Sequence, residues 1–162
     1  MTRRYGRAPQ GERLVCKVPH GHWKTSTFIA ALRHDRVTAP LVLDGAMTGV
    51  IFKAYVEQVL APTLKNNDIV FMDNVSVHKV DGVEQAIEAR GASVCYLPAY
   101  SPDLNPIEQF FAKLKSVLRK MAARTVTSLW KTIAVCLKKI SKSECAAYLA
   151  NSGYSQPKRR TL

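Results

Sequence analysis

The stretch Ile69-Val70-Phe71-Met72-Asp73-Asn74 decides the fold, because a continuous apolar run ends there in two polar residues. An apolar run without alternation predicts a strand buried on both faces of a partly parallel sheet. A short helix is expected over 82–90, where Asp81-Gly82-Val83-Glu84 has capping-box spacing and Gly91 suits a left-handed helix end. A strand is expected to return over 92–97. Strand, helix and strand in succession form a βαβ unit and predict an α/β fold.

Two strands and a helix are expected before this unit. β-Branched and apolar residues favour strands over 23–32 and 37–43, separated by a turn at His34-Asp35-Arg36. Thr48 is a suitable N-cap for the helix that follows, and Pro62 lies near the end of that helix. Its apolar residues recur at helical spacing, namely Phe52, Tyr55, Val56, Val59 and Leu60.

Three helices are expected after the unit. Asn105 is a suitable N-cap and Pro106 fits the first helical position of the strongest of them. One apolar stripe follows along that helix, formed by Ile107, Phe110, Phe111, Leu114 and Leu118. The next helix is expected near 126–140, and Ser141-Lys142-Ser143-Glu144 has the capping-box pattern of a last one that ends near Gly153.

Charge is distributed unevenly along the chain. The 162 residues hold 24 basic and 12 acidic residues, for a net charge of +12. Residues 1–33 contribute +6, residues 34–108 contribute −5 and residues 109–162 contribute +11. Two basic arms around an acidic centre indicate a polyanionic partner such as nucleic acid and leave the acidic centre to be explained by chemistry.

Several classes of protein are excluded by composition. No apolar run approaches the roughly 18–20 residues that cross a membrane, and no apolar segment follows the basic start as in a secretory signal. We therefore expect no membrane partner and a location in the cytosol or at the nucleoid. The four cysteines lack CxxC spacing, and His20-Gly21-His22 has no further ligand at zinc-site spacing.

Two carboxylates lie at positions where catalytic groups are expected. Asp73 follows the carboxyl end of a buried strand, the usual place for active groups in such sheets. Glu108 lies in the first turn of a later helix, where a capping box would also explain it. In a basic protein, two such carboxylates could share a hard divalent ion with a phosphate.

Three motifs of the chain resemble those of a known family. Val70-Phe71-Met72-Asp73-Asn74, His78-Lys79 and the string Tyr100-Ser101-Pro102-Asp103-Leu104-Asn105-Pro106-Ile107-Glu108 are similar to the catalytic domain of mariner-like DDE transposases, specifically the bacterial insertion-sequence branch. Thirty-four residues separate Asp73 from Glu108, which is similar to the spacing of that family's second and third acidic ligands.

The resemblance implies both fold and chemistry. The implied fold is a ribonuclease H-like mixed sheet flanked by helices, and the implied reaction is DNA strand cleavage and strand transfer with two Mg²⁺ or Mn²⁺ ions. Asp73 and Glu108 are the implied metal ligands and catalytic residues, with Asn74, His78 and Asn105 near the site. The basic residues that follow on the same helix are expected either to contact DNA phosphates or to form a solvated face, and they are Lys113, Lys115, Arg119 and Lys120.

One departure from the family is plain. The family's first catalytic Asp lies in a first, central strand upstream of an Arg-Ala-Pro loop, whereas Arg7-Ala8-Pro9 here lies almost at the start and Glu12 is the first acidic residue. The central strand and the family's helix-turn-helix region are therefore expected to be absent. This predicts a frameshift partner, a degenerate copy or a mis-started gene, with Asp44 as a weak substitute ligand.

Three domain regions follow from this interpretation. Residues 1–122 are expected to form a partial catalytic domain, 123–155 to form helices that pack on it, and 156–162 to be a mobile basic tail. The expected partners are double-stranded DNA and an upstream transposase segment, in a dimer or larger assembly. Rival hypotheses are a DNA-binding remnant that inhibits full-length transposase, an RNA-processing nuclease of the same fold, and a purely structural basic protein.

Overall fold

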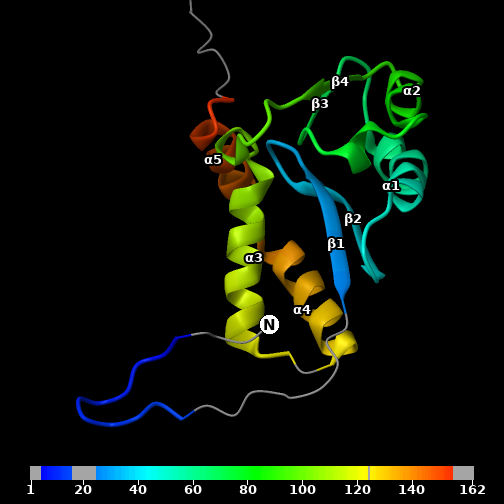
Figure 1. Cartoon of the computed structure of the whole chain (residues 1–162). Coiled ribbons are helices and arrows are strands. Elements are labelled where there is room, and N and C mark those ends of the chain that lie inside the picture. Colours follow the sequence, from blue (N-terminus) through cyan, green and yellow to red (C-terminus); the bar gives the residue numbers. More distant parts are fainter. Residues whose placement is uncertain (1–4, 16–24, 124, 155–162) are drawn as a thin grey trace, which may run out of the picture.

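The computed structural model describes residues 5–15, 25–123 and 125–154. The strands and α-helices follow in the chain order β1 (Ser26–Leu32), β2 (Val37–Asp44), α1 (Gly49–Tyr55), β3 (Ile69–Met72), α2 (Val83–Glu88), β4 (Ser93–Tyr96), α3 (Ile107–Met121), α4 (Val126–Lys139) and α5 (Lys142–Asn151). Strands lie between helices on both sides, as Figure 1 shows, so the α/β expectation is confirmed.

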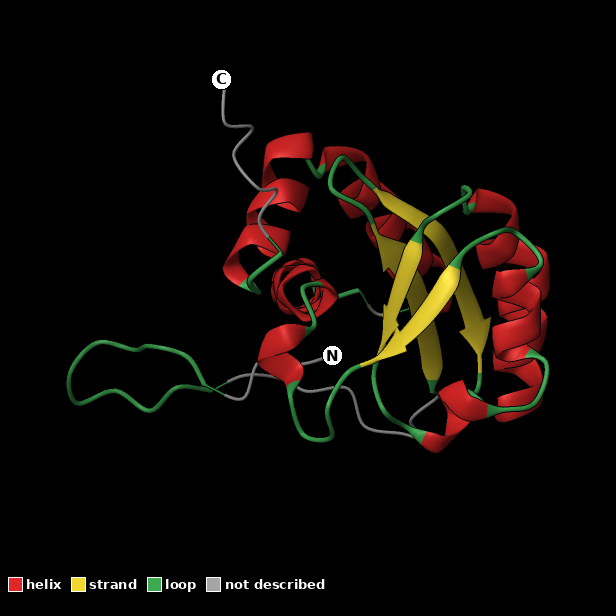
Figure 2. Cartoon of the chain, turned by 90° about the horizontal axis from the view of Figure 1, so that it is seen from above, coloured by secondary structure: helices red, strands yellow, loops and turns green. Residues whose placement is uncertain are grey.

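The strands form two separate pairs (Figure 2). β1 and β2 are antiparallel, with Ser26 opposite Asp44 and an irregularity between Ile29 and Ala31. β3 and β4 are parallel, with Ile69 opposite Ser93. Among the described residues, no backbone pairing joins one pair to the other.

The first hydrophobic core lies on the side of α1 and α2. Phe52 and Tyr55 of α1 are almost fully buried there, together with Val83 and Ile87 of α2 and Met72 of β3. Thr48 caps α1 as expected, because its hydroxyl accepts a hydrogen bond from the Ile51 amide. The helix continues through a π-helical turn, Val56–Leu60, and a 3₁₀ turn, Ala61–Thr63, so Pro62 lies at its end.

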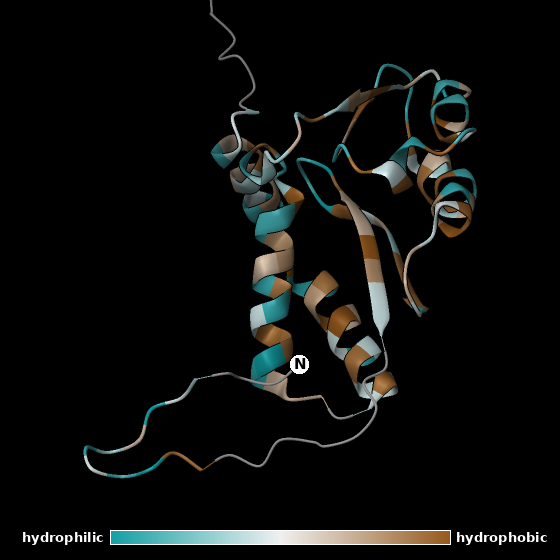
Figure 3. Cartoon of the chain, viewed as in Figure 1, coloured by the Kyte–Doolittle hydropathy of each residue, from teal (hydrophilic) through white to brown (hydrophobic). Residues whose placement is uncertain are grey.

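The second core lies on the opposite side of β1, under α3 and α4. Phe110, Leu114 and Leu118 recur at helical spacing on α3 and are buried against Ile133 of α4. Polar and apolar bands alternate along α3 in Figure 3, as expected of an amphipathic helix. Phe28 of β1 meets the rings of Phe110 and Phe111 edge-on, which joins this core to the sheet.

Two features of the last helices agree with the sequence analysis. Ser141 and Glu144 form a complete capping box at the start of α5. Gly153 follows that helix with a φ of 88°, in the left-handed region that favours glycine. No helix in the described part of the chain is both long and apolar enough to cross a membrane.

Three local expectations are wrong. β3 is not buried on both faces, because Ile69 is 58% and Phe71 41% exposed. α2 has no capping box, since its N-cap is Gly82, which makes no side-chain cap. Asn105 does not cap α3, whose N-cap is Pro106, because the Asn105 amide is used elsewhere.

Strand bounds differ little from those expected where they can be compared. β1 begins at Ser26, while Trp23, the His20–His22 pair and the tail 156–162 lie outside the described residues. β4 is one residue shorter at each end than the expected 92–97. The division of the chain at residues 122 and 155 remains a prediction.

Candidate active site

Asp73 lies at the carboxyl end of β3, directly after the buried Met72. Its Oδ1 accepts a hydrogen bond of 2.8 Å from Nδ2 of Asn105, which lies just before α3. This bond joins the end of β3 to the start of α3 across 32 residues of sequence. It also leaves the second carboxylate oxygen of Asp73 without a protein donor among the hydrogen bonds of the described residues.

Glu108 lies in the first turn of α3, so the Asn105 bond brings its helix towards Asp73. Glu108 and Asp73 border the same cavity of about 590 Å³, together with Asn105 and His78. Glu108 is partly exposed and makes no side-chain hydrogen bond within the described part of the chain. The two sequence-predicted carboxylates therefore face one space, and Glu108 is free to bind a ligand in it.

His78 is held beside Asp73 by two contacts. Its Nδ1 lies 3.0 Å from the main-chain oxygen of Asp73, and its ring lies on Phe52 with 4.4 Å between centroids and 30° between planes. These contacts fix the orientation of the imidazole at the edge of the cavity. Asn74, the other near-site residue, is exposed and does not line the cavity.

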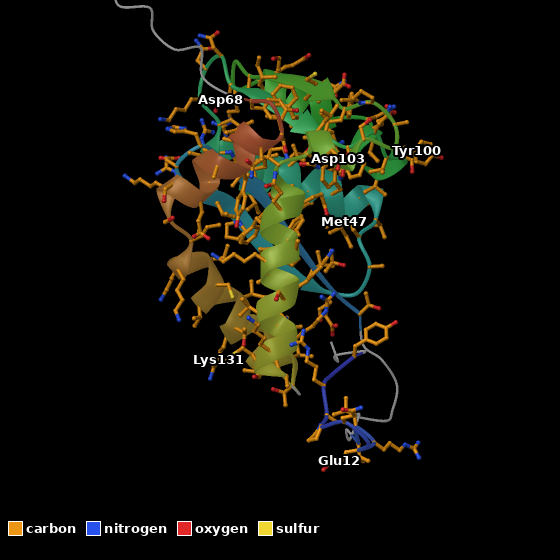
Figure 4. The ribbon with its side chains drawn as sticks, turned by 90° about the vertical axis from the view of Figure 1, so that its left-hand side faces the viewer. Glu12, Met47, Asp68, Tyr100, Asp103 and Lys131 are labelled. Carbon is orange, nitrogen blue, oxygen red and sulfur yellow. The ribbon has the colours of Figure 1, made fainter. Side chains whose placement is uncertain are left out.

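The four predicted cations of α3 fall into two groups. The Lys113 ammonium pairs with the Glu144 carboxylate of α5, and its hydrogen bond is the main cause that lowers the pKa of Glu144. Lys115, Arg119 and Lys120 are exposed on α3 and belong to no ion pair within the described ranges. Figure 4 shows α3 towards the viewer, with Lys131 of α4 beside it. Lys113 therefore connects α3 to α5 through an ion pair, while the other three basic side chains are available to bind an anion.

An ion pair also lines the cavity, and it lies at the start of β3, whereas Asp73 lies at its end. Arg33, after β1, donates from both terminal nitrogens to the two Asp68 oxygens, each at 2.8 Å. The Arg33 hydrogen bonds are the largest cause that lowers the pKa of Asp68 below its ordinary value. The Lys65 amide donates to the same carboxylate at 2.8 Å. The cavity thus extends from this ion pair to the Asp73 and Glu108 carboxylates.

The donor atoms at the cavity are suited to a divalent metal ion. Asp73, Glu108 and the Asn105 side-chain oxygen are the hard oxygen donors that Mg²⁺ and Mn²⁺ prefer. Within the residues that the structure describes, no three His, Cys, Asp or Glu side chains are arranged to hold a metal ion. Asp44 is exposed at the end of β2 and does not border the cavity. The residues fit part of a metal site, because the carboxylates of Asp73 and Glu108 border one cavity.

Three contributors to the site were missed by sequence reasoning. Phe52 was expected only as a core residue, although it also stacks on His78. The Arg33 and Asp68 pair joins residues 35 positions apart, and no local motif marks it. Tyr154 lies against Phe71 with 4.8 Å between ring centroids and donates to the Leu104 oxygen at 2.9 Å, which braces the loop before α3.

Comparison with protein families gives one match, to the DDE superfamily endonucleases, over residues 1–129. The chain belongs to this family. The matched residues include Asp73, Asn105 and Glu108. A search of curated proteins found no match.

Solved structures of Mos1 mariner transposase are similar in fold to this family member. The Mos1 strand transfer complex has a TM-score of 0.76 at 17% identity, covering 94% of this chain and 47% of the Mos1 chain. The catalytic domain of Mos1 mariner transposase has a TM-score of 0.68 at 15% identity, covering 80% of this chain and 74% of that one. The Mos1 catalytic domain with raltegravir and Mg has a TM-score of 0.67 at 16% identity, with 80% and 76% covered. The chain thus spans about half the length of the Mos1 protein in the strand transfer complex, and it shares its fold.

Proposed function

We propose that the chain is the catalytic part of a transposase of the mariner-like superfamily and acts in metal-dependent cleavage and transfer of DNA strands. The observation that supports this most directly is the shared cavity of Asp73 and Glu108, which the Asn105 hydrogen bond draws together. The family assignment makes phosphodiester chemistry the reaction class. The chemical roles below follow from where each side chain lies.

Asp73 and Glu108 would hold Mg²⁺ or Mn²⁺ in this proposal, one from the end of a strand and one from the first turn of a helix. Divalent ions in such sites supply Lewis-acid activation of the attacking oxygen and of the phosphate. Asn105 orients Asp73 so that one carboxylate oxygen stays available. His78 lies at the edge of the site and is suited to a phosphate oxygen or a water molecule.

DNA is the proposed substrate and double-stranded DNA the proposed partner. The similar Mos1 structures include a strand transfer complex and a paired-end complex with the left transposon end. In this chain Lys115, Arg119 and Lys120 extend from Glu108 along one helix, and residues 109–162 contribute +11 of the net charge. Contacts of this kind position a phosphate backbone without reading its sequence. We place the activity in the bacterial cytoplasm beside nucleoid DNA, as part of insertion-sequence transposition.

The proposal includes an incomplete ligand set. Three carboxylates border the cavity, but Asp68 is paired with Arg33, so only Asp73 and Glu108 are left for a metal, whereas a two-metal site of the implied kind uses three. We infer that an upstream transposase segment supplies the third, in a dimer or a larger assembly, and that the chain alone does not cut DNA. The same observation supports the second candidate function, a DNA-binding remnant that competes with full-length transposase, because the described residues hold no complete metal cluster.

Metal binding and DNA nicking test the two candidates separately. Mn²⁺ titration followed by thermal unfolding should raise the melting temperature of the chain, since a ligand that binds only the folded state stabilises it. Asp73→Asn and Glu108→Gln should each remove most of that gain, and Asp103→Asn, a change of an exposed carboxylate in the neighbouring loop, should leave it intact. Equal gains in all four proteins would contradict the shared site.

Nicking of supercoiled plasmid then distinguishes enzyme from remnant. We expect Mg²⁺-dependent nicking when the upstream segment is supplied, and its loss in the Asp73→Asn variant. DNA binding without nicking in that same assembly would support the remnant and overturn the enzyme.

A further inference from the structure

A second cavity lies between α3 and α4, apart from the candidate active site. It has a volume of about 450 Å³, and the described residues that line it belong to these two helices or, in the case of Ile140, directly follow α4. The α3 residues that line it fall on one stripe of the helix, formed by Phe110, Lys113, Leu114, Val117 and Met121. The α4 residues recur with the same period from Ser128 to Lys139. Two parallel stripes of this kind form a groove that follows both helices.

The floor of the groove is apolar. Phe110 and Leu114 are buried at its base, and Val117 is half-buried beside them. At its sides Met121 of α3 is 64% exposed and Val135 of α4 is 49% exposed. Apolar side chains that stay exposed along a groove are typical of a surface that binds another molecule.

The rim of the groove is positively charged. Lys113, Lys131 and Lys139 line it, and no acidic residue does so within the described part of the chain. Lys113 pairs with Glu144, whereas Lys131 and Lys139 are exposed and belong to no ion pair in the described ranges. Burial raises the pKa of the Cys136 thiol, and the charges of Lys113 and Lys139 act against that rise, so both ammonium groups lie near the floor. An acidic partner would complement this rim.

The groove lies on the opposite side of α3 from the candidate active site. An α-helix turns by about 100° per residue, so Lys115 and Arg119, seven and eleven residues after Glu108, share its side of the helix. Val117 comes nine residues after Glu108 and therefore lies on the other side. No described residue lines both the groove and the 590 Å³ cavity. A molecule in the groove would leave the catalytic carboxylates accessible.

The dimensions of the groove suit an α-helix. From Phe110 to Met121 the α3 stripe extends about 17 Å at 1.5 Å per residue, which is the length of three helical turns. A third helix in this position would place apolar residues, at steps of three and four, between the side chains of α3 and α4. Acidic residues beside that apolar stripe would meet Lys131 and Lys139, whose position beside α3 is shown for Lys131 in Figure 4.

We propose that the groove between α3 and α4 is a docking site for an amphipathic helix of a partner protein, about three turns long, with an apolar stripe flanked by acidic residues. Duplex DNA matches the rim but not the apolar floor, because its backbone is bound by charged and polar groups. A second copy carries Glu84 and Glu88 on α2. The apolar residues of that helix, Val83 and Ile87, are fully buried in its own core and cannot enter a groove.

The test titrates the chain with a synthetic peptide of about 18 residues, long enough to form a helix. The peptide is alanine-based, with leucines at alternating steps of three and four residues and glutamates on either side of them. One control has the same composition with the leucines spread around the helix, and the other has lysines in place of the glutamates. By calorimetry the acidic amphipathic peptide should bind at one site, at least about tenfold more tightly than either control. The methyl resonances of Val117, Met121 and Val135 should shift as it binds.

Variants of the groove give the second arm. Val135→Asp should weaken binding of the acidic peptide at least about tenfold, because it places a negative charge on the apolar surface. The matched change Val50→Asp, at a valine of α1 that is 79% exposed, should leave binding unchanged. Lys131→Glu with Lys139→Glu should reverse the preference, so that the lysine peptide binds more tightly than the glutamate peptide. Both lysines are exposed, so this double variant keeps its fold even where Val135→Asp does not.

Equal affinity for the three peptides, or an unchanged preference in the double lysine variant, would overturn the proposal. The same three methyl resonances are also followed during titration with a short DNA duplex and as the chain alone is concentrated. Equal shifts in either experiment would overturn the proposal, because DNA or a second copy would then be the occupant. None of these outcomes depends on metal binding or nicking, so failure here is distinct from failure of the proposed nuclease activity.

Discussion

Breaking the Arg33 and Asp68 ion pair should destabilise the chain at neutral pH. Both Asp68 oxygens accept charged hydrogen bonds of 2.8 Å from Arg33, and the two side chains are only 21% and 23% exposed. Asp68→Asn replaces one acceptor with an NH₂ group that faces a guanidinium donor. A hydrogen bond to a charged group contributes roughly 1.5–3 kcal/mol, and discounting for partial exposure leaves an expected cost of about 1.5–2 kcal/mol.

A double-mutant cycle isolates this interaction. The free energy of unfolding in urea is measured for the original chain, Arg33→Met, Asp68→Asn and the double variant, with the m-value checked for constancy. The coupling energy should be about 1–2 kcal/mol. The control cycle uses Lys53 and Glu57, a pair at 4.0 Å whose side chains are 41% and 45% exposed, and should give about 0.5 kcal/mol or less.

The pH dependence supplies a second check. Arg33 lowers the pKa of Asp68 in the folded chain, so the unfolded state binds a proton more readily. The stabilisation is therefore complete above the ordinary carboxyl pKa of about 3.9 and is lost as the pH falls through the lower folded value. A coupling energy that equals that of the control pair at pH 7, or that is unchanged at pH 2.5, would refute the reasoning.

Three further predictions concern the site and its supports. Asn105→Ala should weaken Mn²⁺-induced stabilisation severalfold, because Asp73 loses its 2.8 Å donor. Asn105→Asp should weaken it less, because the new carboxylate can itself bind the ion. Calorimetric titration measures both effects. Phe110→Ala should cost about 3–5 kcal/mol in urea unfolding, since Phe110 is 2% exposed between Phe28 and Ile133. The double variant Lys115→Gln/Lys120→Gln should bind DNA with a shallower slope of log affinity against log salt concentration. The expected change in slope corresponds to the loss of about two phosphate contacts, and fluorescence anisotropy measures it.

The order of elements could be predicted because it depends on local patterns. The unbroken apolar run gives β3 its bounds, the 3.6-residue stripe predicts α3, and the Ser141 capping box marks the start of α5. Each signal lies within one element. These three local interactions do not depend on partners elsewhere in the chain.

Two of the three wrong expectations involve partners distant in sequence, and the third, the capping box of α2, fails locally because Gly82 is the N-cap. Asn105 has the pattern of an N-cap, but a carboxylate 32 residues away accepts its amide. Phe71 has the pattern of a buried strand residue, yet it is 41% exposed because β3 is paired on one edge only among the described residues. The roles of Asp73 and Glu108 as metal ligands remain predictions, although the structure places both on one cavity.

The buried contact between Tyr55 and Ala39 has a consequence for sequence variation. The Tyr55 hydroxyl donates to the Ala39 oxygen at 2.8 Å, and Ala39 has a φ of 49°, in the left-handed region that disfavours large side chains. Natural variants should therefore keep alanine, glycine or asparagine at position 39. They should also keep tyrosine at position 55, since phenylalanine would fill the space but leave a buried carbonyl without its donor. The two positions, 16 residues apart, are therefore both expected to vary little, because together they fix the bend of β2 on α1.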